Sequence, residues 1–242
     1  MHPPSAYRIF PLSDTAISID WGNTIDVNIN NKVQALFQCF QHEKKDFIRD
    51  VIPAYSNITI IYNPVILWKQ GVENIDDYVR KYVEAILVNC TNRPVAEQPI
   101  IQIPVCYHAE VAPDLQAFCA AKNITEEKLI QLHSSEIYQV FMLGFLPGFA
   151  YMGTVPESLA MPRKAQPATQ VAAGSVGIAG RQTGIYPFQS PGGWHIIGQT
   201  PEAMFQQNRK QPALLQPGNR VQFVPIDLST YYSLKQNKNT CL

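Results

Sequence analysis

The sequence has few charged residues. Lys, Arg, Asp and Glu make up 16% of its 242 residues, against roughly 25% in average proteins. Its 19 basic residues balance its 19 acidic ones, so no overall field exists to attract nucleic acid or an anionic membrane. We therefore expect neither as a partner. A surface poor in charge is a weak indication of protein–protein contact, because interface cores are depleted of charged residues.

Long apolar runs and paired cysteines are also missing. No run approaches the roughly 20 residues that span a bilayer, and the first residues lack the basic and apolar pattern of a signal peptide. No close CxxC pair occurs among the cysteines, which are Cys39, Cys90, Cys106, Cys119 and Cys241. We therefore expect neither a metal site nor a disulfide framework, and we expect the cytoplasm as the location.

The length suits two modest domains. In the first, apolar residues at helical spacing, such as Val33, Leu36 and Phe40, alternate with short β-favouring runs. The pattern predicts the order ββαββα, closed by a strand over residues 100–107, with the helices on one sheet face. The strands are expected at residues 7–10, 15–21, 48–54 and 57–62, the helices around residues 33–40 and 75–87, and a linker at residues 93–99.

The second half of the sequence has a different pattern of predicted elements. Residues 113–122 and 125–133 predict short helices, the latter with Thr125 as N-cap. After Ile137, glycine and proline interrupt the chain every few residues, which is typical of a barrel or sandwich of short strands. A last strand is expected at residues 220–225, and the polar tail after Thr230 is expected to fray.

The most distinctive segment is residues 144–153, in which aromatic residues alternate with glycine and proline. Proline fixes φ and glycine allows tight turns, so this loop can be rigid with its rings directed outward. Exposed aromatic residues are favoured anchors at protein interfaces. The predicted partner-binding residues are Phe145, Pro147, Phe149, Tyr151, Tyr186, Pro187 and Trp194.

A glycine-rich stretch at residues 174–180 looks like a phosphate-binding loop, but it lacks the Lys-Ser/Thr ending of a P-loop. A turn at a barrel corner is the favoured interpretation. Ser175 does not fit a nucleophile elbow, because the GxSxG pattern fails.

Two polar groups are candidates for chemistry. His133 stands beside Ser134, Ser135 and Glu136 at the end of a predicted helix, where it could act in acid–base catalysis or simply cap the helix. Arg163 and Lys164 could bind a carboxylate or phosphate, or form an ordinary solvated pair. The sequence shows no complete catalytic constellation.

Residues 133–200 resemble the signature of the family named for allophanate hydrolase subunit 1. This family also contains the sporulation-kinase inhibitor Kip and the B subunit of bacterial 5-oxoprolinase. The resemblance implies an α+β protein with a ferredoxin-like domain over residues 1–96, a cyclophilin-like β-barrel over residues 97–232 and a polar tail over residues 233–242. Its segments are residues 133–135, 144–153, 161–163, 173–180, 182–187 and 190–200.

For function, the resemblance implies a B subunit that works with a larger C subunit and an A subunit. Together they couple ATP hydrolysis to the opening of 5-oxoproline, giving glutamate, with Mg²⁺ and ATP held by the complex and no activity in this chain alone. The expected catalytic residues are His133, Arg163 and Gln182. The expected substrate or nucleotide loop contains Ser175, Gly177 and Gly180.

The resemblance leaves two other functions open: inhibition of a sensor histidine kinase and, more weakly, a part in urea or allophanate metabolism, for which no fused carboxylase or amidase domain is apparent. Without its partner the chain is expected to self-associate. Two positions depart from the family pattern, since Ala168 and Ala172 stand where an Arg and a Pro are common. Without that Arg an anion clamp with Arg163 would be weaker, and Lys164 lacks the planar fork to replace it.

Overall fold

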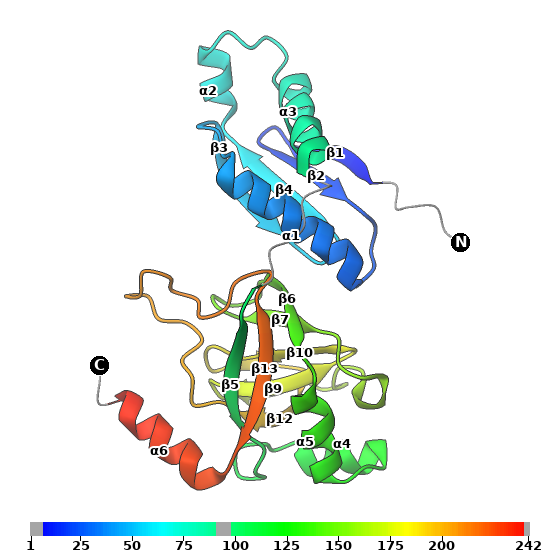
Figure 1. The fold of residues 1–242 in the computed structure, drawn as a ribbon, viewed down its shortest axis with the longest axis vertical. Coiled ribbons are helices and arrows are strands. Elements are labelled where there is room, and N and C mark those ends of the chain that lie inside the picture. The colour runs from blue at the N-terminus through cyan, green and yellow to red at the C-terminus, as the bar shows by residue number, and fades with distance from the viewer. Residues whose placement is uncertain (1–6, 91–97, 240–242) are drawn as a thin grey trace. The chain divides into compact units, whose positions relative to one another are not determined.

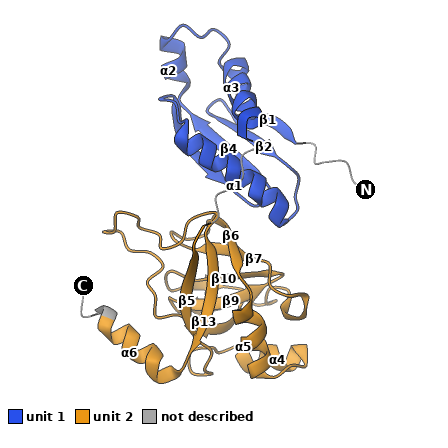
Figure 2. Ribbon diagram, viewed as in Figure 1, with its two compact units in different colours: residues 1–97 blue, residues 98–242 orange. Residues whose placement is uncertain are grey.

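The computed structural model describes residues 7–90 and 98–239. The chain divides into two compact units, residues 1–97 and 98–242 (Figure 2). Each unit is built around its own hydrophobic core. The predicted linker at residues 93–99 lies almost wholly outside the described residues.

The first unit is a four-stranded antiparallel sheet with helices. The strand order is β1-β2-β4-β3, and α1 packs against α3 and across β3 and β4 (Figure 1). Its elements are β1 (Arg8–Ser13), β2 (Ala16–Asp20), α1 (Val27–His42), β3 (Ile48–Pro53), β4 (Asn57–Tyr62), α2 (Pro64–Lys69) and α3 (Ile75–Cys90). The predicted order ββαββα is confirmed apart from α2, while the name ferredoxin-like stays a prediction.

The core of this unit follows from the two periodicities of the sequence. Ile58 and Ile60 alternate along β4 and are fully buried, as strand geometry requires of a half-buried sheet. On α1, Val33, Leu36 and Phe40 form one buried face. The missed helix α2 has only six residues, too few to show a helical period, although its start carries the expected signals of Pro64 at the first turn and an Asn63 cap.

Cys39 and Cys90 form a disulfide, contrary to the expectation from the sequence. The two residues are 51 positions apart, and only the packing of α1 on α3 brings them together, which spacing along the chain does not reveal. Cys106 and Cys119 are buried free thiols, and Cys241 lies outside the described residues.

The second unit contains a closed β-barrel, which confirms the α+β class and the expected barrel. Strands β5 and β13 run parallel, and every other pair in the barrel is antiparallel. Around the barrel the order is β10 (Gln182–Ile185), β7 (Ala150–Gly153), β6 (Tyr138–Leu143), β13 (Arg220–Ile226), β5 (Ile100–Cys106), β12 (His195–Gln199) and β9 (Ser175–Ala179). The name cyclophilin-like stays a prediction.

The strand at residues 100–106 corrects one expectation. It does not close the first sheet, because all seven of its residues pair with β13 in the barrel. A parallel partner more than a hundred residues away leaves no local signal in the sequence.

Helices flank the barrel at several points. Thr125 caps α5 (Glu126–Ser135) by accepting a hydrogen bond from the Lys128 N–H at 3.2 Å, as predicted. The other elements of this unit are α4 (Leu115–Lys122), α5 (Glu126–Ser135), a 3₁₀ turn η1 (Glu157–Leu159), the small sheet of β8 (Ala168–Val171) and β11 (Ser190–Gly192), and α6 (Leu228–Asn239).

The expectation of a frayed tail is wrong for residues 231–239, which belong to helix α6 (Leu228–Asn239). The Asp227 carboxylate accepts a hydrogen bond from the Thr230 N–H at 2.7 Å and so caps the helix. Tyr231 is buried, and its hydroxyl donates to the Gln199 side chain at 2.8 Å. One buried tyrosine and a cap therefore help to hold this helix.

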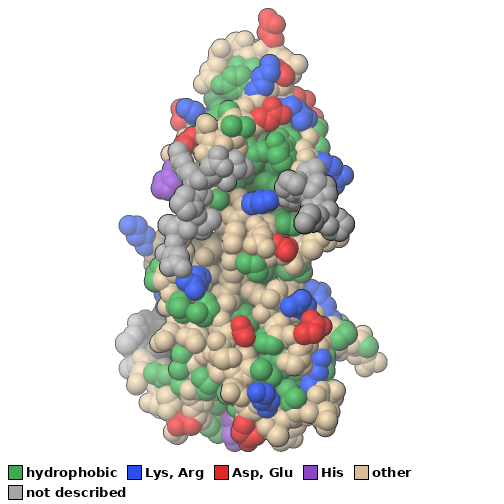
Figure 3. Space-filling view, turned by 45° about the vertical axis from the view of Figure 1, so that its right-hand side comes forward, with side chains coloured by type: hydrophobic (Ala, Val, Ile, Leu, Met, Phe, Trp, Pro, Cys, Tyr) green, Lys and Arg blue, Asp and Glu red, His purple; other side chains and the backbone are tan. Residues whose placement is uncertain are grey.

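Charged side chains of both signs are scattered over the face of the molecule in Figure 3, with hydrophobic and uncharged groups between them. None of the helices in the described residues is long and apolar enough to cross a membrane.

The turn at Gly174 generates a stability prediction. Gly174 has φ +80°, and a Cβ there would collide with the Thr200 backbone oxygen. Gly174→Ala therefore combines backbone strain with a clash, and we expect it to lower the free energy of unfolding by about 2 kcal/mol or more. Urea unfolding followed by circular dichroism measures this change.

The matched control is Gly193→Ala, because a Cβ at Gly193 meets nothing closer than 3.7 Å. We expect that substitution to change the free energy by roughly 0.5 kcal/mol or less. Equal effects of the two substitutions would contradict the account of this turn.

Candidate functional site

The side chains of strand β10 point alternately into the barrel and toward its outer surface. Successive residues of a strand point to opposite faces. The Thr183 hydroxyl accepts from or donates to His133 Nε2 at 2.9 Å and donates to the Gly177 carbonyl at 3.1 Å, and all of these groups are buried. Thr183 therefore points inward, and its neighbours Gln182 and Gly184 face outward.

His133 belongs to a buried hydrogen-bond chain. Because the Thr183 hydroxyl gives its proton to Gly177, it must accept the proton of His133 Nε2. Nδ1 is then free to accept from the Tyr107 hydroxyl at 2.8 Å. The ring also stacks on Phe223 with a centroid separation of 4.6 Å. Burial lowers the pKa of His133 to about 3, so the imidazole is neutral.

This position corrects the expectation that His133 is an acid–base catalyst. Its side chain is 0% exposed and both ring nitrogens are occupied. A general base must reach the proton that it removes, and a ring enclosed in the barrel interior does not reach a ligand on the outer face. The structure supports a structural role, which spacing alone could not separate from a catalytic one.

The expected nucleotide loop is also corrected. Ser175 and Gly177 lie in β9, which pairs with β10 on one side and β12 on the other. Gly180 forms a bridge with Met161. Backbone N–H groups that are already used in a sheet cannot cradle a phosphate. Glycine is needed in this barrel strand for packing, because a Cβ at Gly177 would lie 3.0 Å from the Trp194 side chain.

The outer face of β7, β9 and β10 carries a small cavity of about 240 Å³. Aromatic rings line it together with one cation and a rim of proline and glycine. Its residues are Phe145, Phe149, Tyr151, Arg163, Pro167, Tyr186, Pro191, Gly192, Gly193 and Trp194. We call it the aromatic pocket. It brings together five of the residues expected to bind a partner and one expected to be catalytic.

Most of these rings form the floor and do not project as anchors, which corrects the expectation of outward rings. Phe149 and Tyr186 are each 1% exposed and Trp194 is 4% exposed. Phe149 meets Tyr186 and Trp194 edge to face, with centroids 5.2 and 5.4 Å apart. Only Phe145 stands out, at 59% exposed.

The remaining expected anchors lie apart from the pocket lining. Pro147 is exposed on the same loop as Phe145, and Pro187 is buried. The rim residues Pro191, Gly192 and Gly193 were not predicted as site residues, although the Pro-Gly-Gly sequence marks a turn. Gly192 has a specific role, because a Cβ there would overlap the Tyr186 hydroxyl.

The backbone around Arg163 is held on both sides. His195 Nε2 donates to the Pro162 carbonyl at 2.9 Å, and the Lys164 N–H donates to the Gly193 carbonyl at 2.8 Å. The Lys164 ammonium pairs with Asp114 at 2.5 Å. Lys164 is thus neutralised and does not share in an anion clamp.

Arg163 is exposed at the rim, and the structure shows no hydrogen bond or ion pair from its guanidinium to any described residue. Burial raises the pKa of Tyr151, and the charge of Arg163 opposes the rise. Burial also raises the pKa of Tyr186, against a backbone hydrogen bond from Trp194 and the charge of Arg163. Both phenols are neutral at physiological pH, so the pocket lining carries one net positive charge.

Gln182 lies on the same outward face as the pocket. It pairs with Gly153 across β7, and Tyr151 is its diagonal neighbour, a spacing of about 7–8 Å that long side chains can bridge. Gln182 is 8% exposed, and its Nε2 has no hydrogen-bond partner among the described residues. A buried amide donor without a partner is costly, which marks it as a group available to an oxygen acceptor.

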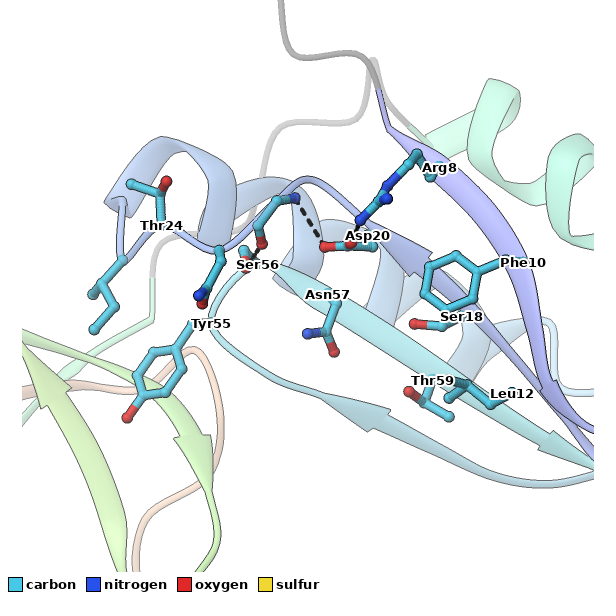
Figure 4. A pocket seen from close by; sticks show the side chains of 13 residues that line it. Arg8, Phe10, Leu12, Ser18, Asp20, Thr24, Tyr55, Ser56, Asn57 and Thr59 are labelled. Carbon is cyan, nitrogen blue, oxygen red and sulfur yellow. Dashed lines mark hydrogen bonds and ion pairs between the residues drawn. The ribbon is translucent and has the colours of Figure 1, made fainter.

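A larger hollow of about 500 Å³ lies in the first unit, against β1, β2 and β4 (Figure 4). Its charges compensate each other, since Arg8 and Asp20 pair at 2.7 Å and Asp20 also accepts from the Gly22 N–H at 2.8 Å. The rest of the lining offers hydroxyl, amide and apolar groups without a free charge. The aromatic pocket is therefore the better candidate for specific recognition of an ion.

The buried histidine generates the second prediction. Replacing it by Phe in His133→Phe keeps a flat ring against Phe223 but leaves the Tyr107 and Thr183 hydroxyls without their partner. We expect the free energy of unfolding to fall by about 1–3 kcal/mol at pH 7.5, because the buried Tyr107 hydroxyl loses its acceptor while Thr183 keeps its bond to the Gly177 carbonyl.

This deficit should shrink in acid. The folded-state pKa of His133 is lowered to about 3 from 6.5, so the unfolded wild type binds one more proton between these values. Wild-type stability therefore falls by about 1.4 kcal/mol per pH unit below 6.5, and the Phe variant lacks that loss. Urea unfolding at pH 7.5 and 5.5 tests this, and a deficit that stays constant or grows on acidification would refute it.

Comparison with known proteins agrees with this architecture. The family model described as carboxyltransferase domain, subdomain C and D, matches residues 7–215. The 5-oxoprolinase B subunit of Bacillus subtilis is 36% identical over 236 residues, covering 96% of this chain and 98% of that protein. The B subunit of the same enzyme in Haemophilus influenzae is 38% identical over 217 residues, covering 90% and 97%.

A solved structure gives the same picture. The crystal structure of TTHA0988 superposes with a TM-score of 0.75 and 29% identity, covering 88% of this chain and 40% of that one. The two B subunits are more than 30% identical to this chain over at least 90% of its length, and the family model matches most of the chain. Together these two findings establish the family. This chain belongs to the carboxyltransferase subdomain C and D family, together with the bacterial 5-oxoprolinase B subunits.

Proposed function

We propose that this chain is the B subunit of an ATP-dependent 5-oxoprolinase complex, which opens 5-oxo-L-proline to L-glutamate. The observation that carries the proposal is the identity of 36% and 38% to two proteins named as 5-oxoprolinase B subunits, over 90% or more of this chain. The other subunits would be a larger C-like protein and an A-like protein.

The aromatic pocket supports a role in binding and not in complete catalysis. Opening a lactam requires activation of the amide, a nucleophilic water and groups that move protons. The lining has aromatic rings, Pro, Gly and a single Arg163, with no carboxylate, imidazole or thiol. The missing groups would come from the partner subunits, which agrees with a chain that is inactive alone.

The residues that the structure describes do not fit ATP and Mg²⁺. The described residues hold no group of three or more His, Cys, Asp or Glu side chains able to hold a metal ion. The Gly-rich stretch offers no free N–H cradle, because β9 is paired on both edges. We therefore assign the nucleotide to the other subunits and derive no step through it here.

The kinase-inhibitor hypothesis is less well supported. It depends on aromatic side chains that project as anchors, and three of the expected anchors, Phe149, Tyr186 and Trp194, are buried. Among the expected anchors, only Phe145 and Pro147 are exposed, and this small apolar projection would equally suit contact with the larger subunit or a second copy of this chain.

Reconstitution tests the proposal. Purified C-like and A-like proteins are assayed for 5-oxoproline-dependent ATP hydrolysis with and without this chain, and ATP hydrolysis without 5-oxoproline is subtracted. We expect the 5-oxoproline-dependent rate of ATP hydrolysis to fall at least about tenfold when this chain is omitted, because the complex then lacks the aromatic pocket.

Full activity without the chain would refute the proposal. An inactive complete mixture, in which the chain does not co-purify with the C-like protein, would also refute it and would favour the kinase-inhibitor hypothesis.

A further inference from the structure

We infer that the aromatic pocket binds a small five-membered cyclic amide bearing one carboxylate, with the carboxylate on Arg163 and the ring over Tyr151 and Trp194. The identification of the ring rests on the proposed function, whereas the charge and size of the ligand rest on the pocket alone. The sequence comparison assigns no residue to this role.

The charge of the ligand follows from the electrostatics of the rim. Arg163 is the one charged residue of the lining, and its guanidinium makes no hydrogen bond or ion pair with a described residue. The neighbouring cation, Lys164, is neutralised by Asp114 at 2.5 Å. A guanidinium presents two parallel N–H groups that match a carboxylate. One free guanidinium in an uncharged pocket selects a monoanion.

The size of the ligand follows from the cavity. Its volume of about 240 Å³ lies below the roughly 300–1,000 Å³ of pockets that hold drug-sized ligands. A nucleoside triphosphate carries several negative charges and needs several cations or a metal, and the lining provides one cation. The pocket therefore fits a compact metabolite.

The shape of the ligand follows from the walls. Phe149, Tyr186 and Trp194 form a floor of buried rings that are fixed by edge-to-face contacts. Tyr151 stands beside Trp194, with ring centroids 5.9 Å apart. Such a surface buries the carbon atoms of a flat ring and loses little side-chain entropy on binding. The apolar part of the ligand lies here while its carboxylate points to the rim.

This placement differs from a role for Arg163 in charge stabilisation during amide activation. An arginine that holds the carboxylate contacts substrate and transition state equally, so its loss raises KM and leaves kcat unchanged. An arginine that stabilises the developing charge lowers kcat when it is lost. The two roles are therefore separated by kinetics.

The experiment uses the reconstituted complex with Arg163→Gln. We expect KM for 5-oxo-L-proline to rise about tenfold or more, with kcat and the KM for ATP within about twofold of wild type. Arg163→Lys should recover part of the loss, because a lysine keeps the charge without the fork. Arg209→Gln, an exposed arginine outside the pocket lining, is the matched control and should leave KM unchanged.

A neutral ligand completes the test. The amide of 5-oxo-L-proline lacks the carboxylate but keeps the ring. As a competitor, wild type should bind it about tenfold or more weakly than the acid, and Arg163→Gln should bind both about equally. A fall in kcat at constant KM, or an unchanged KM, would overturn the inference and leave the subunit assignment intact.

If the complete mixture is inactive, the proposed function fails and the pocket is tested on this chain alone. Isothermal titration with 5-oxo-L-proline should then show binding that Arg163→Gln weakens about tenfold. No binding, or equal binding by wild type and variant, would overturn the inference.

Discussion

The hydrogen bond between Thr183 and His133 inside the barrel determines which side of β10 faces the solvent. Because strand neighbours alternate, an inward Thr183 forces Gln182 and Gly184 outward. A slip of one residue would bury Gln182 in the barrel core and expose Thr183. A fully hydrogen-bonded buried network resists such a slip, since any other register leaves polar groups unsatisfied. The outer face on which the pocket lies depends on this register.

The outward face of β9 and β10 is lined by glycines, and this allows the pocket to form. A Cβ on Gly184 would lie 2.9 Å from the Ala150 carbonyl oxygen and 3.1 Å from the rings of Phe149 and Trp194. The absence of a side chain lets these rings settle directly on the sheet. They become a rigid floor, and the loop that carries Arg163 is fastened to the strand residue His195 at the edge of this floor. In the proposed function, this rigid floor is in place before the ligand binds, and the other subunits would supply the groups for the chemistry.

The sequence predicted much of this arrangement. Periodicity located α1 and α3, turn residues indicated short barrel strands, and Thr125 was recognised as a cap. The sequence also singled out the aromatic run and Arg163, and the structure brings them to one pocket, while their role in a site stays a prediction. These successes rest on local signals, namely spacing, capping chemistry and turn propensity.

The incorrect predictions concern burial and contacts between residues that are distant in the sequence. Spacing could not tell that His133 points into the barrel, because its neighbours Tyr107 and Thr183 are distant in the sequence. Nor could it tell that Phe149 and Trp194 are buried, since an aromatic residue beside glycine suits a floor as well as an exposed loop. The disulfide of Cys39 and Cys90 likewise depends on helix packing.

The central claim is that this chain binds 5-oxo-L-proline in the aromatic pocket, with its carboxylate on Arg163. The most direct measurement is a titration of the ¹⁵N-labelled chain with 5-oxo-L-proline, followed by nuclear magnetic resonance. The account predicts that the Trp194 indole and the Gly192 and Gly193 amides shift with the ligand, while the His133 amide does not. Shifts confined to the first unit, or no saturable shift in chain or complex, would contradict it.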